Sequence, residues 1–151
     1  MQLTAYSDYS LRVLMYLGAR ELAGHDLSSI AEIARAFKIS RNHLTKVVHH
    51  LGQRGFIETV RGRGGGIRLA KPPKKIRIGA VYRSTERFAL APCFDNKDCS
   101  IVDACALKGV LDEALDSFIT TLDAYTLADL LEKKRAPRAV LMQIVRAIAR
   151  T

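Results

Sequence analysis

The sequence lacks the features that would assign it to a membrane or to a secreted framework. No stretch approaches the ~20 consecutive apolar residues of a membrane span, and the first residues show no apolar run behind a basic start. The three cysteines are odd in number, which argues against a disulfide scaffold. We therefore expect a cytoplasmic protein with reduced thiols and no membrane partner.

Enzymatic signatures are also lacking. The four histidines, at positions 25, 43, 49 and 50, show no convincing partnership with a nucleophile or an acid–base residue. The glycine-rich segment 61–66, RGRGGG, has neither the G-x-x-x-x-G-K-S/T spacing of a phosphate-binding loop nor a helix start after it. We expect no catalytic activity.

The three cysteines form a regular series in which five residues separate Cys93 from Cys99, and Cys99 from Cys105. Structural zinc sites usually pair their ligands two to four residues apart and need a fourth ligand, so this spacing is a poor match for zinc. One interpretation is that the thiols are unrelated residues of a surface loop. However, free cysteines are normally buried, whereas this loop is polar, and thiolates also select iron–sulfur clusters. The wide spacing favours a cluster.

The net charge of +9 lies entirely in the first half of the chain. Residues 1–80 contain fourteen Lys and Arg against five Asp and Glu, while residues 81–151 contain ten of each kind. This asymmetry predicts a polyanionic partner for residues 1–80.

Helical periodicity predicts an amphipathic helix at the start of the chain, with Asp8 opposite its apolar stripe and pointing outward. The S-x-x-E capping box of Ser29 and Glu32 then begins a short helix that ends near Lys38. A second helix follows Ser40 and ends at Gly55. Two short helices joined by a three-residue turn predict a helix-turn-helix. The apolar stripe of the second helix leaves groove-reading residue types on its other side: Arg41, Asn42, Thr45, Lys46 and His49.

Two short strands, FIETV and IRLA, flank the glycine-rich turn and predict a β-hairpin wing. Arg61 and Arg63 in this turn suit a phosphate ridge or a narrow minor groove. The segment KPPKK that follows is interpreted either as a backbone contact to DNA or as a soluble turn. Residues 78–88 predict a short connecting helix.

A long helix is predicted from Leu107, because apolar residues recur at intervals of three and four as far as Tyr125. The small N-terminal module offers little to cover this stripe, so pairing with a second copy is favoured. Thr126 and Asp129 should begin another short helix. A basic amphipathic run after Pro137 would cover the long helix, bind a partner or, as a lesser alternative, lie on a membrane surface.

The predicted fold is therefore mainly α with a small β-hairpin wing. A winged helix-turn-helix DNA-binding domain spans residues 1–80, and a connecting helix with the cysteine loop spans 81–106. A dimerisation helix and C-terminal helices span 107–151.

Several segments together resemble a bacterial family of winged-helix regulators: MQLTAYSDYSLRVLMYL, ISRNHLTKVV, VRGRGGGIRLAKP, IRIGAV, the C-x5-C-x5-C loop and DAYTLADLL. The likeness is to the nitric-oxide-sensing repressors of that family, the NsrR group, which stands beside the iron–sulfur regulators of the IscR group. It covers residues 1–133, and the tail after Lys134 has no counterpart in it.

The resemblance implies a homodimer with one iron–sulfur cluster per subunit, [4Fe–4S] in preference to [2Fe–2S], held by Cys93, Cys99 and Cys105. In NsrR-like proteins the remaining ligand can be an aspartate near the start of the other subunit's first helix, and the matching position is Asp8. IscR-like proteins use a histidine shortly after the third cysteine. Residues 106–108 here are Ala, Leu and Lys, and no histidine follows His50, which favours the NsrR-like arrangement.

The resemblance also implies that a recognition helix and a wing bind palindromic double-stranded operator DNA. The matching positions in this sequence are Ser40, Arg41, Asn42, His43, Thr45, Lys46, Arg61, Arg63 and Gly64. Such proteins repress nitrosative-stress genes and release their operators when nitric oxide attacks the cluster. The alternatives are a regulator of the same fold that senses iron or cluster supply, and an iron–sulfur electron-transfer protein, to which a basic winged helix would be of no use.

Overall fold

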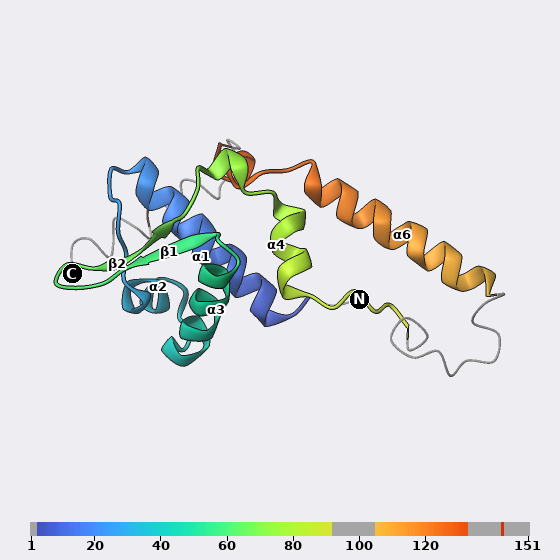
Figure 1. Cartoon of the computed structure of the whole chain (residues 1–151), viewed down its shortest axis with the longest axis horizontal. Helices are drawn as coiled ribbons and strands as arrows, with labels where there is room; N and C mark the ends of the chain where they lie inside the picture. Colours follow the sequence, from blue (N-terminus) through green and yellow to red (C-terminus); the bar gives the residue numbers. More distant parts are fainter. Residues whose placement is uncertain (1–2, 92–104, 133–142, 144–151) are drawn as a thin grey trace.

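The computed structural model describes residues 3–91, 105–132 and 143, and Figure 1 shows the arrangement of its elements. These are α1 (Ala5–Leu22), α2 (Ile30–Phe37), α3 (Arg41–Gln53), β1 (Ile57–Val60), β2 (Gly66–Leu69), the 3-10 turn η1 (Pro73–Lys75), α4 (Ile78–Thr85), α6 (Ala106–Asp123) and α7 (Leu127–Glu132). The predicted tail helix after Pro137 falls largely outside the described residues.

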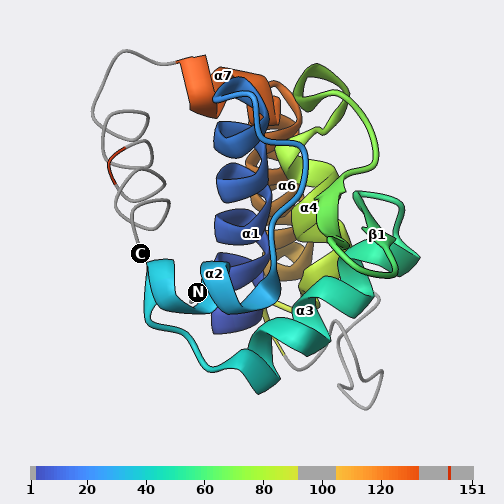
Figure 2. The same ribbon diagram turned by 90° about the vertical axis from the view of Figure 1, so that its left-hand side faces the viewer.

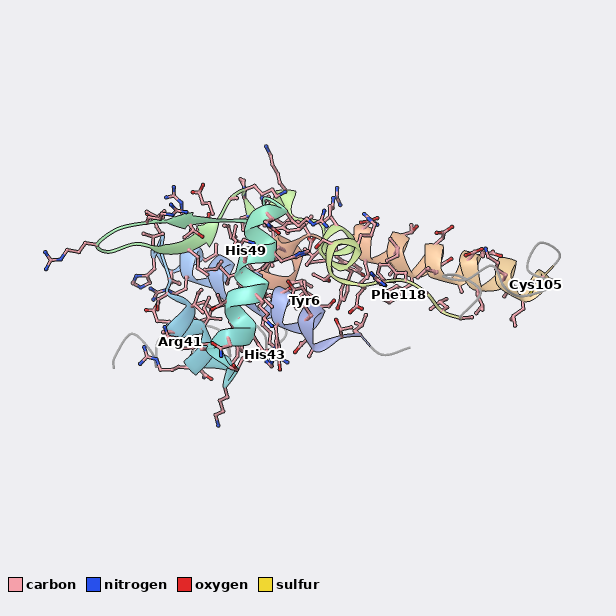
Figure 3. All side chains as sticks on the ribbon, turned by 60° about the horizontal axis from the view of Figure 1, so that its bottom comes forward. Tyr6, Arg41, His43, His49, Cys105 and Phe118 are labelled. Carbon is pink, nitrogen blue, oxygen red and sulfur yellow. The ribbon has the colours of Figure 1, made fainter. Side chains whose placement is uncertain are left out.

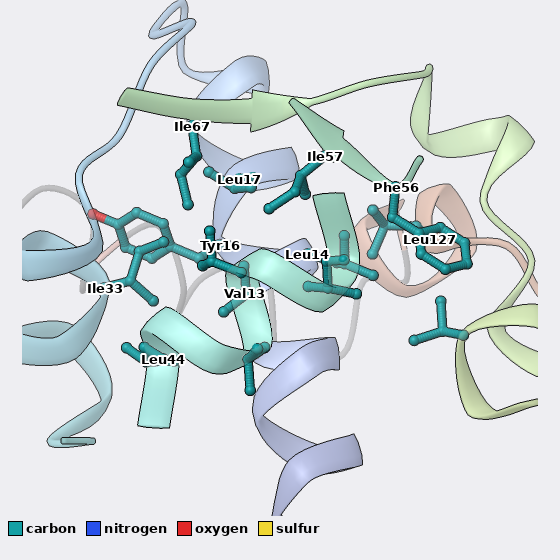
Figure 4. Packing of buried hydrophobic residues seen from close by; sticks show 14 of the residues in the cluster. Val13, Leu14, Tyr16, Leu17, Ile33, Leu44, Phe56, Ile57, Ile67 and Leu127 are labelled. Atoms are coloured by element: carbon teal, nitrogen blue, oxygen red, sulfur yellow. The ribbon is translucent and has the colours of Figure 1, made fainter. Parts of the chain in front are cut away.

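Helix α1 supplies the centre of the core. Its residues Val13, Leu14 and Tyr16 are fully buried, and α1 packs against α2, α3, α4, α7 and β2. Gly18 permits the close approach of α7, because a Cβ at this position would lie 2.6 Å from Leu131 Cδ1. Figure 4 shows this core, to which the other elements contribute Ile33, Leu44, Phe56, Ile57, Ile67 and Leu127.

The predicted helix-turn-helix is confirmed in its local detail. Ser29 and Glu32 form the reciprocal capping box at the start of α2, which satisfies backbone N–H groups that have no partner within the helix. Lys38 adopts a left-handed conformation, with φ of 55°, and ends α2. Residues 38–40 then connect α2 to α3. Ser40 occupies the N-cap position of α3, although its side chain makes no capping hydrogen bond.

The predicted hairpin is also present. Strands β1 and β2 pair antiparallel, from Ile57 opposite Leu69 to Val60 opposite Gly66. The turn between them contains Gly62 and Gly64 at φ of 104° and 79°, a conformation that residues with a side chain rarely adopt. Outside the hairpin, Ser28 exchanges two backbone hydrogen bonds with Ile67, at 3.0 and 2.8 Å. This bridge ties the hairpin to the start of α2.

Helix α6 extends away from the α1–α3 region in Figure 1, and in Figure 2, which looks along the long axis, it lies behind α1. It is joined to α4 by a two-bonded ion pair in which both Arg83 guanidinium nitrogens lie 2.7 Å from Asp123 carboxylate oxygens. None of its residues is buried, and Leu107 and Val110 are 65% and 62% exposed. The mainly helical fold with a hairpin wing is thus confirmed.

Helix α7 begins as predicted, with Asp129 accepting hydrogen bonds from the backbone and side chain of Thr126 at 2.7 and 2.6 Å. Its buried residues Leu127 and Leu131 join the same hydrophobic cluster as α1. The division of the chain into functional segments at residues 80 and 106 stays a prediction.

Two leucines of α1 provide a matched test of this packing. Leu14 is fully buried, whereas Leu22 is 53% exposed. Leu14→Ala should lower the free energy of unfolding by ~2–5 kcal/mol, because the cavity adds to the lost apolar burial. Leu22→Ala should change it by less than ~0.5 kcal/mol. Urea denaturation of both variants measures the difference, and equal losses would contradict the central position of α1.

Candidate nucleic-acid interface and metal-ligand residues

The exposed side of α3 carries the polar residues predicted from its periodicity. Its opposite side, formed by Leu44, Val47, Val48 and Leu51, is buried. Figure 3 shows three of the exposed side chains, Arg41, His43 and His49, along the helix. Between positions 41 and 49 the exposed residues are Arg41, Asn42, His43, Thr45, Lys46 and His49. A positively charged helix face with amide and imidazole groups is therefore available to a ligand.

Two tyrosines of α1, Tyr6 and Tyr9, contact α3. The hydroxyl of Tyr6 donates to the carbonyl of Lys46 at 3.3 Å, and the ring of Tyr9 lies 6.4 Å from that of His43. An apolar pocket of about 210 Å³ remains between the two helices at this point. A movement of the first turns of α1 would therefore displace Lys46 and His43, which lie on the exposed side of α3.

The hairpin adds a second basic feature. Arg61, Arg63 and Gly64 are exposed in its turn, and Figure 3 shows the hairpin reaching beyond α3. Other basic residues in and after the hairpin have partners of their own: Arg68 of β2 pairs with Glu58, and the ammonium of Lys71, two residues after β2, lies 4.8 Å from the centre of the Phe56 ring. The arginines of the turn are thus better placed than Arg68 or Lys71 to meet an external anion.

Asp8 is exposed, as predicted, but it has a local partner that the sequence analysis did not assign. Its Oδ2 lies 2.8 Å from Arg12 Nε, and the two side chains are 49% and 43% exposed. The reason is that residues four apart share one side of a helix. The Arg12 guanidinium also lies 5.7 Å from the Phe37 ring centre, so Arg12 connects Asp8 to the end of α2.

Cys105 is the predicted thiol that the structure describes. It has a free thiol of intermediate exposure and occupies the N-cap position of α6. Cysteine sulfur is a ligand type that zinc, copper(I) and iron–sulfur clusters accept, so this position is chemically suited to a metal. Cys93 and Cys99 lie in the segment 92–104, outside the described residues. Within the part of the chain that is described, no three His, Cys, Asp or Glu side chains gather closely enough to hold a metal.

Asp8 and Cys105 belong to different ends of the chain's structure. Figure 3 places Cys105 at the far end of α6, Phe118 part of the way along it, and Tyr6 of α1 beyond Phe118. The thirteen residues from Cys105 to Phe118 alone span ~20 Å of helix. Tyr6, at the start of α1, and Cys105 therefore lie well apart within one chain.

A polar seam where α1, α3 and α4 meet was missed by the sequence analysis. It consists of contacts in which Ser84, Thr85 and Glu86, at the end of α4, accept hydrogen bonds from His50 of α3, Ser7 of α1 and Thr4, the N-cap of α1. Burial, followed by the charge of Arg54, lowers the pKa of His50 within this seam. Burial would raise the pKa of Glu86, but hydrogen bonding to its carboxylate, to which Thr4 contributes, outweighs burial and lowers that pKa. No local sequence period signals these contacts.

A three-residue turn between two helices, an exposed basic second helix and a glycine-turned hairpin define a winged-helix DNA-binding regulator. None of the helices in the described ranges has the length and hydrophobicity needed to cross a bilayer. The chain belongs to the Rrf2 family, described as iron-dependent transcriptional regulators, whose model matches residues 3–133.

Similar proteins bear names of the same kind. The chain is 51% identical over 146 residues to the HTH-type transcriptional regulator NsrR of Geobacillus kaustophilus, covering 95% of this chain and 98% of that protein. It is 54% identical over 137 residues to NsrR of Bacillus subtilis, covering 89% and 92%. The chain is therefore a transcriptional regulator and not an enzyme. The family model ends at residue 133, as the resemblance does, whereas the alignment with the Geobacillus protein covers 95% of this chain and so continues into the tail.

Solved structures of the family share the fold. IscR of T. potens superposes with a TM-score of 0.67 at 26% identity and covers 87% of both chains. Staphylococcus aureus CymR superposes with a TM-score of 0.68 at 26% identity, covering 85% of this chain and 97% of that one.

Proposed function

We propose that this chain is a cytoplasmic repressor that binds palindromic operator DNA as a homodimer, carries an iron–sulfur cluster, and releases the DNA when nitric oxide reacts with that cluster. The observation that carries the proposal is the presence of two separate features in one fold. An exposed basic α3 suits DNA, and a thiol at the N-terminus of α6 suits a metal. The family description as iron-dependent regulators and the NsrR names of relatives at 51% and 54% identity support it.

The proposed DNA contacts are the exposed residues of α3 and of the hairpin turn. Arg41 can take a guanine bidentately and Asn42 an adenine. Arg61 and Arg63 would lie against phosphates or in the minor groove. The full proposed set is Ser40, Arg41, Asn42, His43, Thr45, Lys46, Arg61, Arg63 and Gly64.

The proposed homodimer uses α6. Leu107 and Val110 are left exposed in the single chain, and the apolar stripe that starts at Leu107 runs along an 18-residue helix with no buried residue. Pairing of two such helices would remove this surface from water. In this proposal residues 1–80 bind DNA, residues 81–106 connect α4 to the cluster, and residues 107–151 join the subunits.

The residues that would hold the cluster are Cys93, Cys99 and Cys105 of one subunit and Asp8 of the partner subunit. In Figure 3, Tyr6 of α1 lies beyond Phe118 as seen from Cys105, an arrangement that favours a contribution from the partner subunit. To serve as a ligand, Asp8 must leave Arg12. That exposed ion pair is worth only ~0–1 kcal/mol, so the exchange costs little. When bound, the cluster would supply iron that reacts with nitric oxide.

The free energy needed to switch DNA binding on or off is more than exposed ion pairs supply, which favours cluster ligation across the dimer as the means of switching. Moving a dimer from 99% to 1% DNA-competent requires ~5.5 kcal/mol of differential stabilisation. Exposed pairs such as Asp8 with Arg12 provide ~0–1 kcal/mol each. A carboxylate that fixes α1 of one subunit to the cysteine loop of the other would hold the two α3 helices at a set separation, as two half-sites require.

Substitutions in α3 test the base contacts. Arg41→Ala or Asn42→Ala should each remove ~1–3 kcal/mol of discrimination between operator and altered operator. Lys74→Ala, at an exposed position of η1, is the control and should lower the salt slope by at most ~0.9. Binding titrations with operator and random duplexes at several salt concentrations give both quantities. Equal losses on the two duplexes would remove the base-reading assignment.

Nitric oxide tests the sensing function. Anaerobic protein should lose its visible absorbance and release operator DNA when nitric oxide is added, because the link between the subunits is lost. Asp8→Ala should leave a folded dimer with looser cluster binding or an altered reaction. Absorbance and fluorescence anisotropy of labelled operator, followed together, measure both effects.

Iron chelation is the control for this experiment, since a regulator of iron supply would release DNA on chelation and ignore nitric oxide. Full operator affinity after nitric oxide treatment would reject the sensing function. An Asp8→Ala protein with unchanged spectrum and unchanged response would reject the role of Asp8 as a ligand.

A further inference from the structure

Three consecutive residues at the end of α4 each contact a different part of the DNA-binding helices. Ser84 Oγ lies 3.4 Å from His50 Nε2 of α3. Thr85 Oγ1 accepts a hydrogen bond from the hydroxyl of Ser7 in α1 at 2.7 Å. Glu86 accepts from Thr4, the N-cap of α1. One helical turn thus holds both the start of α1 and the second half of α3.

The contact with α3 has a defined direction. The hydroxyl of Ser84 donates its one proton to the carbonyl of Val81 at 2.7 Å, so Ser84 Oγ must accept from His50. His50 is therefore the donor through Nε2–H. Its ring also meets the Tyr6 ring edge to face, with centroids 5.6 Å apart, and Tyr6 in turn bonds to the Lys46 carbonyl. These contacts therefore lead from Ser84 through His50 and Tyr6 to Lys46, whose side chain is exposed on α3.

Glu86 forms the strongest of the three contacts. One of its oxygens, Oε1, accepts from the backbone N–H of Thr4 at 2.7 Å and from its hydroxyl at 2.9 Å. A carboxylate is favoured there by the partial positive charge of the N-terminus of α1, and hydrogen bonds to an ionised acceptor are stronger than neutral ones. The two residues are 82 positions apart in sequence. Asp8 lies one turn further along α1, and Cys93 follows Glu86 by seven residues.

We propose that Glu86, with Ser84 and Thr85, is the positioning element that transmits the state of the cysteine loop to α1 and α3 within one subunit. The inference rests on the proposed function and adds a route to it. Asp8 would connect the loop of one subunit to α1 of the other, whereas the end of α4 connects the loop to α1 and α3 of the same chain. A change at the cysteines would reach Glu86 along the chain and, through its hydrogen bonds with Thr4, the first turn of α1.

The test compares operator affinity with and without the cluster, because a merely structural residue would change both affinities alike. In the wild-type protein this ratio should be at least ~10, within the range usual for coupled sites. Glu86→Ala should reduce the ratio at least ~5-fold while iron content stays at the wild-type level. Glu86→Gln keeps an oxygen that can accept from Thr4 and should retain most of the ratio. Arg87→Ala removes a charge from the neighbouring exposed position and should leave the ratio unchanged.

Ser84→Ala is an independent variant that removes the hydrogen-bond acceptor of His50 and leaves the contacts of α4 with α1 in place. It provides the test if the Glu86→Ala protein does not fold. In the Ser84→Ala protein the ratio of operator affinities with and without the cluster should also be lower than in the wild type. Unchanged ratios in Glu86→Ala and Ser84→Ala, or equal losses of affinity in both states, would overturn the inference. A wild-type ratio near one would instead reject the proposed function itself, so the two failures are distinguishable.

Discussion

The structure depends on helix α1, which forms the centre of the core and also contacts the exposed helix α3 and helix α4 through its first turns. Its buried side, from Val13 to Leu17, organises the core shared with α2, α3 and α7, while its first turns carry Asp8 and the contacts to α3 and α4. Because interiors are close-packed and shift as units, a force applied to the first turn of α1 cannot be absorbed locally. It must move α3 relative to its surroundings or break the contacts at the N-terminus.

The charges of the chain follow this division. The basic excess lies in residues 1–80, and part of it, namely Arg41, Lys46, Arg61 and Arg63, is presented on α3 and the hairpin turn. The segment that contains α6 has an apolar stripe and no such excess. One end of the fold is therefore suited to a polyanion, and the other is the end at which we propose the second subunit and the cluster. Helix α4, which lies between them and is fixed to α6 by Arg83 and Asp123, is the physical connection.

Much of the fold could be predicted because its signals are local. The capping box at Ser29, the turn at residues 38–40 and the glycines of the hairpin each act within a few residues. The pairing of Asp8 with Arg12 is local too, and its i,i+4 spacing was a usable signal. The bonds from Ser84 to His50 and from Glu86 to Thr4 join residues 34 and 82 positions apart, and no periodicity encodes them. The geometry of Cys93 and Cys99 falls outside the described residues, so their assignment as ligands stays a prediction.

Control of DNA binding by a thiolate-bound inorganic group is the central claim, and one comparison tests it most directly. Iron and acid-labile sulfide are counted in anaerobically isolated wild-type protein and in the variant with all three cysteines changed to serine, and both are titrated with operator DNA. The account predicts iron and sulfide with tight operator binding in the wild type, and neither group with binding no better than to random DNA in the variant. Equal operator affinity of the two proteins, or a wild type without iron and sulfide, would contradict it.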